Sequence, residues 1–581
     1  MKLFQWQSYC TPTVGVFLVW ASMSLFMVWL WHNYSTQVLI QDQLGHVIRA
    51  EAVGYSWEWM WRDYNEHRTP LLNFVKYLAI QYIGNCQIMG FMSVVFCSLA
   101  GLLSILTVWR LRGNLCYTDI VLPIFFLHGG HFWNIQYNDQ LYIILATFHT
   151  CALIMLMLLS SDRRSGWMEW VALLLLTTLP LHGGNGLLFT PFLGAAMFFQ
   201  AIYRWRKWNI SPWVPVLANV LAVVVCLLYM YDLHFTSSHF SEASFGKRLG
   251  VVITGIALSI GQPGAELPYL VTAGLALFYG GAVWKFHEVS KERSLPIPMI
   301  SLLCLIVAVT LNMIAAGIGR PNHGAAFRYV ILATPIAWFL YLLATLMDKN
   351  ENARVFSGYV QKVLFYAMLL SVWSHYEYAV GLGMDRLKAT WELSQDVQSG
   401  LPVEAVAARN RDYWFHWSDE SFAKALALPK VQAINDIGTV KTLDQMGYET
   451  VQYDSPERIR CVNVVRDAQN PWRFSSDGDG PSGIVFPMEE YGPIKAIAIE
   501  YHIDAESVGI EEKNLLYATW VPLDSIAESC SQSLKRIHHN HGKPNRSVLW
   551  IDARIETLAI AMDSAPFAVE IVGITIYREK P

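Results

Sequence analysis

The chain has 581 residues, of which 54% are apolar and 15% charged, and its formal net charge is −4. Soluble globular proteins carry about 25% charged residues. This composition excludes a disordered chain and an ordinary soluble enzyme, and a chain without net positive charge is a poor partner for nucleic acid. It indicates a multi-pass membrane protein with a water-soluble part attached.

Eleven stretches are long and apolar enough to cross a bilayer as helices, which takes about 20 residues each. The first, residues 11–31, is followed by no small-residue cleavage site, as expected of an uncleaved anchor. Segment 251–263 is too brief for a span, and we expect it to be re-entrant or interfacial. The other ten stretches lie at about 87–109, 117–135, 139–160, 167–182, 185–203, 212–231, 267–285, 297–317, 328–346 and 359–380.

Basic residues fall in alternate loops of this arrangement, and short loops rich in Lys and Arg face the cytoplasm. We therefore expect the loop 32–86, and everything beyond about residue 383, to lie on the outer face. The loops on the basic side carry Arg110 and Arg112, Arg163 and Arg164, Arg204, Arg206 and Lys207, Lys285, Lys291 and Arg293, and Lys349 and Arg354.

The last 200 residues have a different character, with 29 acidic against 20 basic residues beyond residue 383. Residues 384–457 are polar with helical patterning and predict a connector. From 458 to 581, short alternating runs such as IKAIAIEYHI and SVLWIDARI are separated by turn residues, which predicts a small β-sandwich. An outer location would permit a disulfide between Cys461 and Cys530. The expected fold is an α-helical polytopic bundle, residues 1–383, followed by an extracytoplasmic α+β domain.

Ionisable residues at membrane depth are costly and mark functional sites. One group lies in the loop 32–86, where Asp42 is followed by Asp63, Glu66, His67 and Arg68. Tryptophans in the same loop would hold these residues at the lipid–water boundary. A solvated loop anchored by aromatic side chains is the alternative interpretation.

A second group, with His128, His131, Asn138 and Asp139, lies between two predicted spans. Asp139 begins a span, where the positive end of the helix dipole favours an anion. An ordinary helix cap is the alternative interpretation for this aspartate.

A third group, with Arg320, His323 and Arg328 beside glycines, begins a late span. Two guanidinium groups at the boundary suit a phosphate. Arginines that extend to lipid headgroups are the alternative interpretation.

These motifs resemble those of the GT-C superfamily of integral-membrane glycosyltransferases, in particular the protein mannosyltransferases and the aminoarabinose transferases of lipid A. Asp42 followed by the HRTPLL of residues 67–72 resembles an acidic residue followed by a His-Pro-Pro-Leu-like element. Asp139 in NDQL resembles the family's second aspartate, and Arg328-Tyr329 with Pro335 resembles its late Arg-Tyr element. The chain departs from the family in having Arg-Thr-Pro where Pro-Pro is usual, and in lacking an acidic pair at Asp42.

The resemblance implies an enzyme of the bacterial inner membrane that transfers a sugar from a polyprenyl-phosphate donor to an envelope glycan, lipid or protein. Asp42 would be the base, with Asp63 or Glu66 as alternatives. Asp139 would orient the acceptor or help to hold a divalent cation, Mg²⁺ or Mn²⁺. The residues that would bind the leaving phosphate are Arg320 and Arg328, with Arg68 or His67.

Three other functions fit parts of this pattern: a transporter or flippase of lipid-linked sugars, a non-catalytic scaffold for envelope assembly, and an O-antigen ligase or polymerase. Transporters usually contain inverted repeats, which the sequence lacks. The transferase requires Asp42, Asp139 and Arg328 to line one outer cavity, and this requirement distinguishes it from the others.

Overall fold

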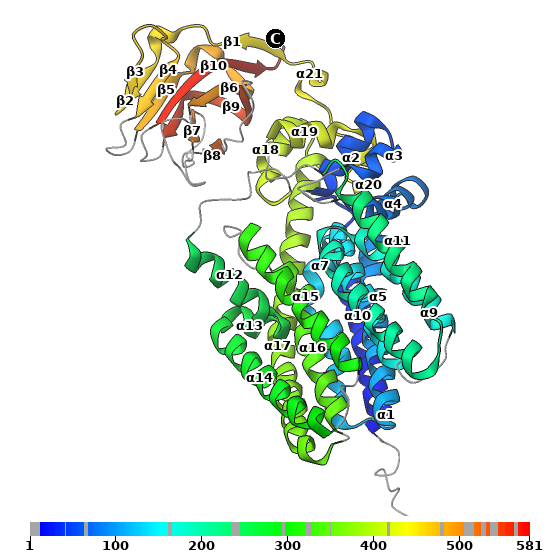
Figure 1. The fold of residues 1–581 in the computed structure, drawn as a ribbon. Coiled ribbons are helices and arrows are strands. Elements are labelled where there is room, and N and C mark those ends of the chain that lie inside the picture. Colours follow the sequence, from blue (N-terminus) through cyan, green and yellow to red (C-terminus); the bar gives the residue numbers. More distant parts are fainter. Residues whose placement is uncertain are drawn as a thin grey trace, which may run out of the picture. The chain divides into compact units, whose positions relative to one another are not determined.

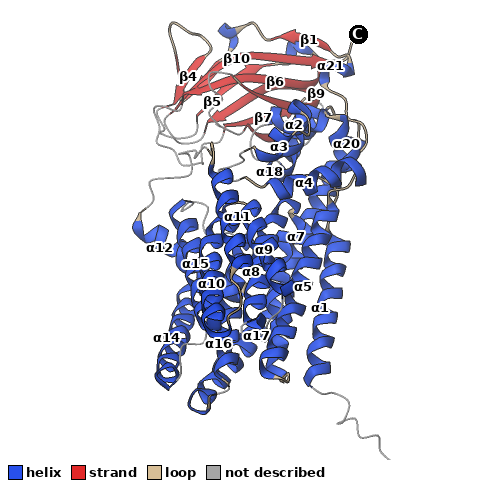
Figure 2. Ribbon diagram, turned by 45° about the vertical axis from the view of Figure 1, so that its right-hand side comes forward, coloured by secondary structure: helices blue, strands red, loops and turns tan. Residues whose placement is uncertain are grey.

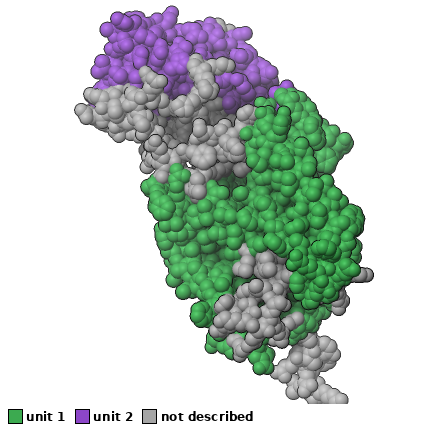
Figure 3. All heavy atoms as spheres, viewed as in Figure 1, with its two compact units in different colours: residues 1–36, 53–387 green, residues 37–52, 388–581 purple. Residues whose placement is uncertain are grey.

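The computed structural model describes residues 12–580 except 41, 63–67, 161–165, 234–243, 293–296, 320–326, 349, 415–418, 477–481, 505–515, 524–529, 535–543 and 563–566. The chain forms two compact units, one of residues 1–36 and 53–387 and the other of residues 37–52 and 388–581 (Figure 3). The boundary near 387 lies close to the predicted one at 383. The sequence did not indicate that residues 37–52 belong with the C-terminal part.

The first unit is a helical bundle (Figure 1). Among the seven long apolar helices in the described part of the chain, α16 is the most buried, with 94% of its most apolar stretch inside the protein. Its elements are α1 Pro12–Tyr34, α3 Trp57–Trp61, α4 Pro70–Leu78, η2 Ala79–Ile83, α5 Gln87–Arg112, η3 Tyr117–Ile120, α6 Val121–Leu127, η4 Gly129–His131, α7 Phe132–Gln136, η5 Asn138–Gln140, α8 Leu141–Ser160, α9 Gly166–Thr178, η6 Leu179–His182, α10 Gly184–Trp208, α11 Trp213–Met230, α12 Phe245–Ala257, η8 Leu258–Ile260, α13 Gln262–Glu266, α14 Pro268–Glu292, α15 Ile297–Gly319, η9 Phe327–Tyr329, α16 Val330–Met347 and α17 Glu351–Gln398.

Seven helices in the described part of the chain are long and apolar enough to cross a membrane. They are consistent with a multi-pass membrane protein and correspond to seven of the eleven predicted spans. Helix α17 has 48 residues, so it is about 72 Å long, more than twice the hydrocarbon thickness of a bilayer. The predicted boundary between span and connector therefore falls inside one continuous helix.

Four predicted spans are not among these seven. The stretch 117–135 is broken into short helical segments, and 167–182 forms a helix of 13 residues followed by a 3₁₀ turn. The stretches 267–285 and 297–317 lie in α14 and α15, which are described only in part. The stretch predicted to be re-entrant is also broken, because α12 ends at Ala257 and the chain turns at Gly261, where φ is +79°.

The second unit contains short helices and the strand-rich domain (Figure 2). The prediction of strands beyond about residue 458 is confirmed, with one strand beginning earlier, at Glu449. Its elements are α2 Asp42–Val53, α18 Val403–Trp414, α19 Asp419–Ala427, α20 Pro429–Asn435, α21 Leu443–Met446, β1 Glu449–Gln452, η10 Pro456–Arg458, β2 Arg460–Val462, β3 Val465–Arg466, β4 Arg473–Ser476, β5 Ser482–Pro487, η11 Glu489–Tyr491, β6 Pro493–Asp504, β7 Leu516–Pro522, β8 Cys530–Leu534, β9 Asn545–Met562 and β10 Phe567–Arg578.

All the strand pairings are antiparallel, and the long strand β9 joins two groups of strands. Its first half pairs with β6, which continues through β10 to β4 and β1, and its second half lies between β5 and β7. Asp552, with φ of 45°, lies at the register shift of the first half, between Trp550 and Ala553. Residues of both groups, among them Phe486 and Ile497, share one hydrophobic core.

Cys461 lies on β2 and Cys530 begins β8, at opposite edges of the group β2-β5-β9-β7-β8. Four strand spacings of about 4.8 Å separate these edges, whereas a disulfide requires Cα atoms within about 7 Å. Cys461 is a free, exposed thiol, so this pair does not form the disulfide that an outer location would permit.

Candidate functional site

The chain between α5 and α8 passes through the bundle as five short helical segments, which carry the second group of polar residues. Gly129 and Gly130 follow α6, and the Gly130 N–H donates to His128 Nδ1 at 3.1 Å, in competition with regular helical bonding. These breaks turn polar side chains inward. His128, His131 and Asp139 are all buried in the first unit.

Asp139 forms a buried ion pair with Lys76, whose ammonium nitrogen lies 2.8 Å from the carboxylate. The exposed fractions of the two side chains are 3% for Lys76 and 9% for Asp139. Helix α4 positions the lysine, and it begins at Pro70, whose fixed φ suits the first turn. Sequence analysis missed Lys76, although a single lysine within the apolar run LLNFVKYLAI is the signal that marks it.

Cys86 lies within electrostatic reach of this ion pair. Burial and, to a lesser extent, the Asp139 carboxylate raise the pKa of its thiol to about 12, with Lys76 opposing the shift. The thiol therefore stays protonated at neutral pH and is not a nucleophile of this site.

Several residues close to Lys76 or Asp139 in the sequence have buried amide side chains. Several polar atoms of these amides have no hydrogen-bond partner in the described part of the chain. Asn134 has neither of its amide atoms paired, although it is fully buried. An unpaired buried polar group costs about 1–3 kcal/mol, so a cluster of them is unusual outside a functional site. The other unpaired atoms are the side-chain oxygens of Asn73, Gln136, Asn138 and Gln140.

Gly90 of α5 allows this polar segment to approach closely. A Cβ atom at this position would lie 2.7 Å from the backbone oxygen of Ile135 and 3.1 Å from Oδ1 of Asn138. The first distance is shorter than real Cβ contacts and the second is tighter than most of them, so a larger residue would push the backbone at Ile135 and the side chain of Asn138 away from α5. Glycine at this position therefore supports the site.

Three buried imidazoles stack beside this segment, and one of them, His375 of α17, was not indicated by the sequence. The ring centroid of His128 lies 4.0 Å from those of His131 and His375, at interplanar angles of 31° and 19°. Metal ligands use lone pairs in the ring plane, which near-parallel stacked rings do not direct to one point. In the residues that the structure describes, no group of three His, Cys, Asp or Glu side chains could hold a metal ion.

The guanidinium of Arg68 is bound to the C-terminal end of α11. It donates to the backbone oxygens of Tyr229 at 2.9 Å, Asp232 at 2.6 Å and Tyr231. Carbonyl groups at a helix C-terminus have no intrahelical partner, and a cation there is favourable. These bonds indicate that Arg68 fastens the loop to α11, and the same donors are not available to a phosphate while they persist.

The remaining predicted residues are not brought into one described cavity. Asp42 begins α2 in the second unit, whereas Asp139, Arg68 and Arg328 belong to the first. The guanidinium carbon of Arg328 lies 5.3 Å from the ring centroid of Tyr329. The convergence of Asp42, Asp139 and Arg328 therefore stays a prediction. The predicted residues outside the described part are Asp63, Glu66, His67, Arg320 and His323.

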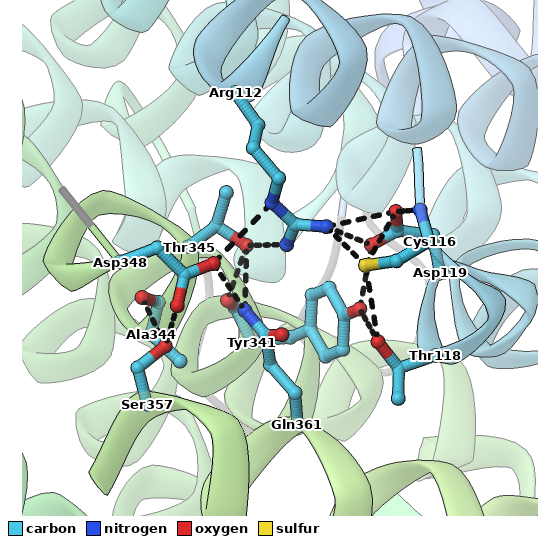
Figure 4. Close-up of polar contacts among 10 residues, drawn as sticks. All are labelled: Arg112, Cys116, Thr118, Asp119, Tyr341, Ala344, Thr345, Asp348, Ser357 and Gln361. Atoms are coloured by element: carbon cyan, nitrogen blue, oxygen red, sulfur yellow. Dashed lines mark hydrogen bonds and ion pairs between the residues drawn. The ribbon is translucent and has the colours of Figure 1, made fainter. Parts of the chain in front are cut away.

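In a second polar cluster, which joins four helical elements, each charged side chain lies beside one of opposite charge (Figure 4). Arg112 at the end of α5 lies 3.0 Å from Asp119 and 3.3 Å from Asp348, and the Tyr341 hydroxyl donates to Asp119 at 2.6 Å. Gln361 of α17 donates to Asp348 at 3.1 Å. Because each of these charges has a partner, this cluster is a structural clamp, in contrast to the unpaired amides beside Asp139.

No protein-family model and no curated protein matches this chain. The function proposed below therefore rests on the residues of the chain itself.

Proposed function

We propose that this protein is a membrane glycosyltransferase that moves a sugar from a polyprenyl-phosphate donor to an envelope glycan, lipid or protein. The observation that carries the proposal is the buried pair of Lys76 and Asp139 among unpaired amides. It supplies a cation for a phosphate, a carboxylate for an acceptor hydroxyl, and hydrogen-bonding groups for a sugar. The resemblance of the NDQL motif to that of GT-C enzymes supports the same reaction.

In the proposed reaction, the oxygen of the acceptor hydroxyl attacks the anomeric carbon of the donor sugar. The bond from that carbon to the phosphate oxygen breaks, and the hydroxyl proton passes to a carboxylate. The prenyl phosphate leaves with both bonding electrons. Removing one group that stabilises such developing charge in a dry site costs about 10²–10³ in rate.

The carboxylates have different proposed roles. Asp139 is held by the ammonium of Lys76, so it suits orienting the acceptor and presenting Lys76 to the phosphate. Asp42 is the proposed base, with Asp63 and Glu66 as alternatives. Arg328 and Arg320, with His67, are the further proposed ligands of the phosphate, whereas the guanidinium of Arg68 is engaged by the end of α11.

A divalent cation does not fit the described side chains. Asp139 is engaged with Lys76, and the described residues include no group of three metal-ligating side chains. We therefore assign no step to Mg²⁺ or Mn²⁺. Transfer that persists in the presence of EDTA is expected, and loss of transfer on chelation would contradict this assignment.

Mass spectrometry of envelope glycolipids and glycoproteins, from cells with and without this protein, tests the proposal and identifies the acceptor. We expect one sugar addition to disappear without the protein. Reconstituted protein supplied with the corresponding polyprenyl-phosphate sugar should restore it, and Lys76→Met or Asp139→Asn should reduce the rate at least 100-fold.

A matched control is Glu169→Gln, because Glu169 forms an ion pair of the same length, 2.8 Å, with Arg204 elsewhere in the bundle. This variant should keep its transfer rate once the amount of folded protein is equalised. Identical envelopes with and without the protein would refute the proposal. Movement of the lipid-linked sugar across the membrane with its phosphate bond intact would assign the transporter instead.

A further inference from the structure

An open hollow of about 640 Å³ lies between helix α3 and the C-terminal end of α11 in the first unit. This volume is within the range of small-molecule sites, which is about 300–1,000 Å³. Its described lining combines aromatic rings with charged side chains of both signs. The lining residues are Trp57, Glu58, Trp61, Arg62, Arg68, Leu228, Tyr231 and Asp232.

The aromatic rings of the hollow are accessible to a ligand. Trp57 is 69% exposed and Tyr231 is 78% exposed. Trp57 and Trp61 are one helical turn apart on α3, so their indoles lie on the same face, with ring centroids 5.6 Å apart and planes at 51°. Because the rings are tilted and not stacked on each other, ring faces remain open for contact with another molecule.

The charged groups favour a neutral ligand over an anion. Glu58 and Asp232 contribute two carboxylates and Arg62 and Arg68 two guanidiniums, so the lining that the structure describes is formally neutral. The guanidinium of Arg68 already donates to three backbone oxygens at the end of α11. Among the described lining residues, a phosphate would therefore meet two carboxylates and one guanidinium that does not bind the end of α11, that of Arg62.

We propose that this hollow binds a pyranose unit of a carbohydrate. The face of a pyranose presents C–H groups to the negatively polarised face of an aromatic ring, and its hydroxyls donate to carboxylates. The combination of open tryptophan faces with Glu58 and Arg62 supplies both kinds of contact. The inference deepens the proposed function, because it makes the acceptor a glycan. Only the role of the bound sugar as acceptor rests on the proposed function.

Equilibrium binding tests the inference without the transfer reaction. The full-length protein in phosphatidylcholine nanodiscs is titrated with two neutral probes, maltohexaose and chitohexaose, and followed by calorimetry and saturation-transfer NMR. We expect at least one probe to bind with a Kd in the millimolar range or tighter. Trp57→Ala should weaken that binding at least tenfold, Trp57→Phe should weaken it less, and Glu58→Gln should weaken it several-fold.

Trp213→Ala is the matched control. Trp213 is 52% exposed at the other end of α11 and contacts Trp170 in an edge-on pair, so it is also an exposed tryptophan of the bundle. Its replacement should leave saccharide binding unchanged. An equal loss of affinity in Trp57→Ala and Trp213→Ala would show a general effect of removing interfacial tryptophans and would overturn the proposal.

Binding of neither saccharide would also overturn it. The proposal would also be overturned if inorganic phosphate, or vesicles containing phosphatidylglycerol, bound in a Trp57-dependent manner while the saccharides did not bind. These failures are distinguishable from failure of the proposed function. Sugar transfer that persists without saccharide binding would refute only the sugar-binding role of the hollow. Saccharide binding in a protein that transfers no sugar would refute only the proposed transferase function.

Discussion

Replacing Lys76 and Asp139 one at a time and then together separates a catalytic ion pair from a structural one. The charges are 2.8 Å apart and almost inaccessible to water, so their Coulomb attraction is about 6 kcal/mol at an effective dielectric constant of 20. Desolvation offsets most of this attraction. Removing one partner leaves a buried, unpaired charge, and we expect Lys76→Met or Asp139→Leu to destabilise the protein by about 3–5 kcal/mol.

The double variant Lys76→Met/Asp139→Leu removes both charges and fills the space with apolar groups. Such replacements are often neutral or stabilising by about 1–4 kcal/mol. Melting temperatures in one detergent should therefore be lowered in both single variants and restored in the double variant. Transfer activity per folded molecule should remain lost in all three.

Two results would refute this reasoning. A double variant that regains both stability and transfer activity would show that the pair only holds the helices together. Single variants that melt at the same temperature as the unmodified protein would show that the two charges are not buried as a pair.

Three further predictions concern other parts of the chain. Arg68→Ala should increase amide hydrogen exchange at residues 229–232, because three carbonyls lose their donor, and unchanged exchange would contradict this role. Burial raises the pKa of Glu404 above its ordinary value of 4.5, so stability should fall as pH rises above about 4.5. Glu404→Gln keeps an acceptor for the Leu443 N–H and should make stability depend less on pH. The same dependence of stability on pH in both proteins would contradict this prediction. Cys461, exposed on β2, should react with a membrane-impermeant maleimide in spheroplasts, and Cys461→Ser should abolish this labelling. Labelling only in inverted vesicles would show that the C-terminal domain faces the cytoplasm.

Composition and hydropathy were sufficient to predict a membrane bundle and a strand-rich C-terminal domain. The apolar residues that a span needs are contiguous in the sequence, and strand alternation is visible within ten residues. The number of spans was harder to predict from the sequence. The stretch 117–135 has the composition of a span, but polar side chains and Gly129-Gly130 break its helix, and a hydropathy window does not detect such breaks.

The partners of the polar residues depended on the tertiary structure. Asp139 was a candidate because an acid at a span boundary is unusual, but Lys76 is 63 positions earlier and only the packing of α4 against this segment brings them together. Arg68 fitted a phosphate site by its type, whereas the structure engages it with the end of α11. Charge and hydropathy are properties of single residues, and so the sequence alone determines them. Which charge neutralises which is decided by distances between remote segments, and only the folded chain sets these distances.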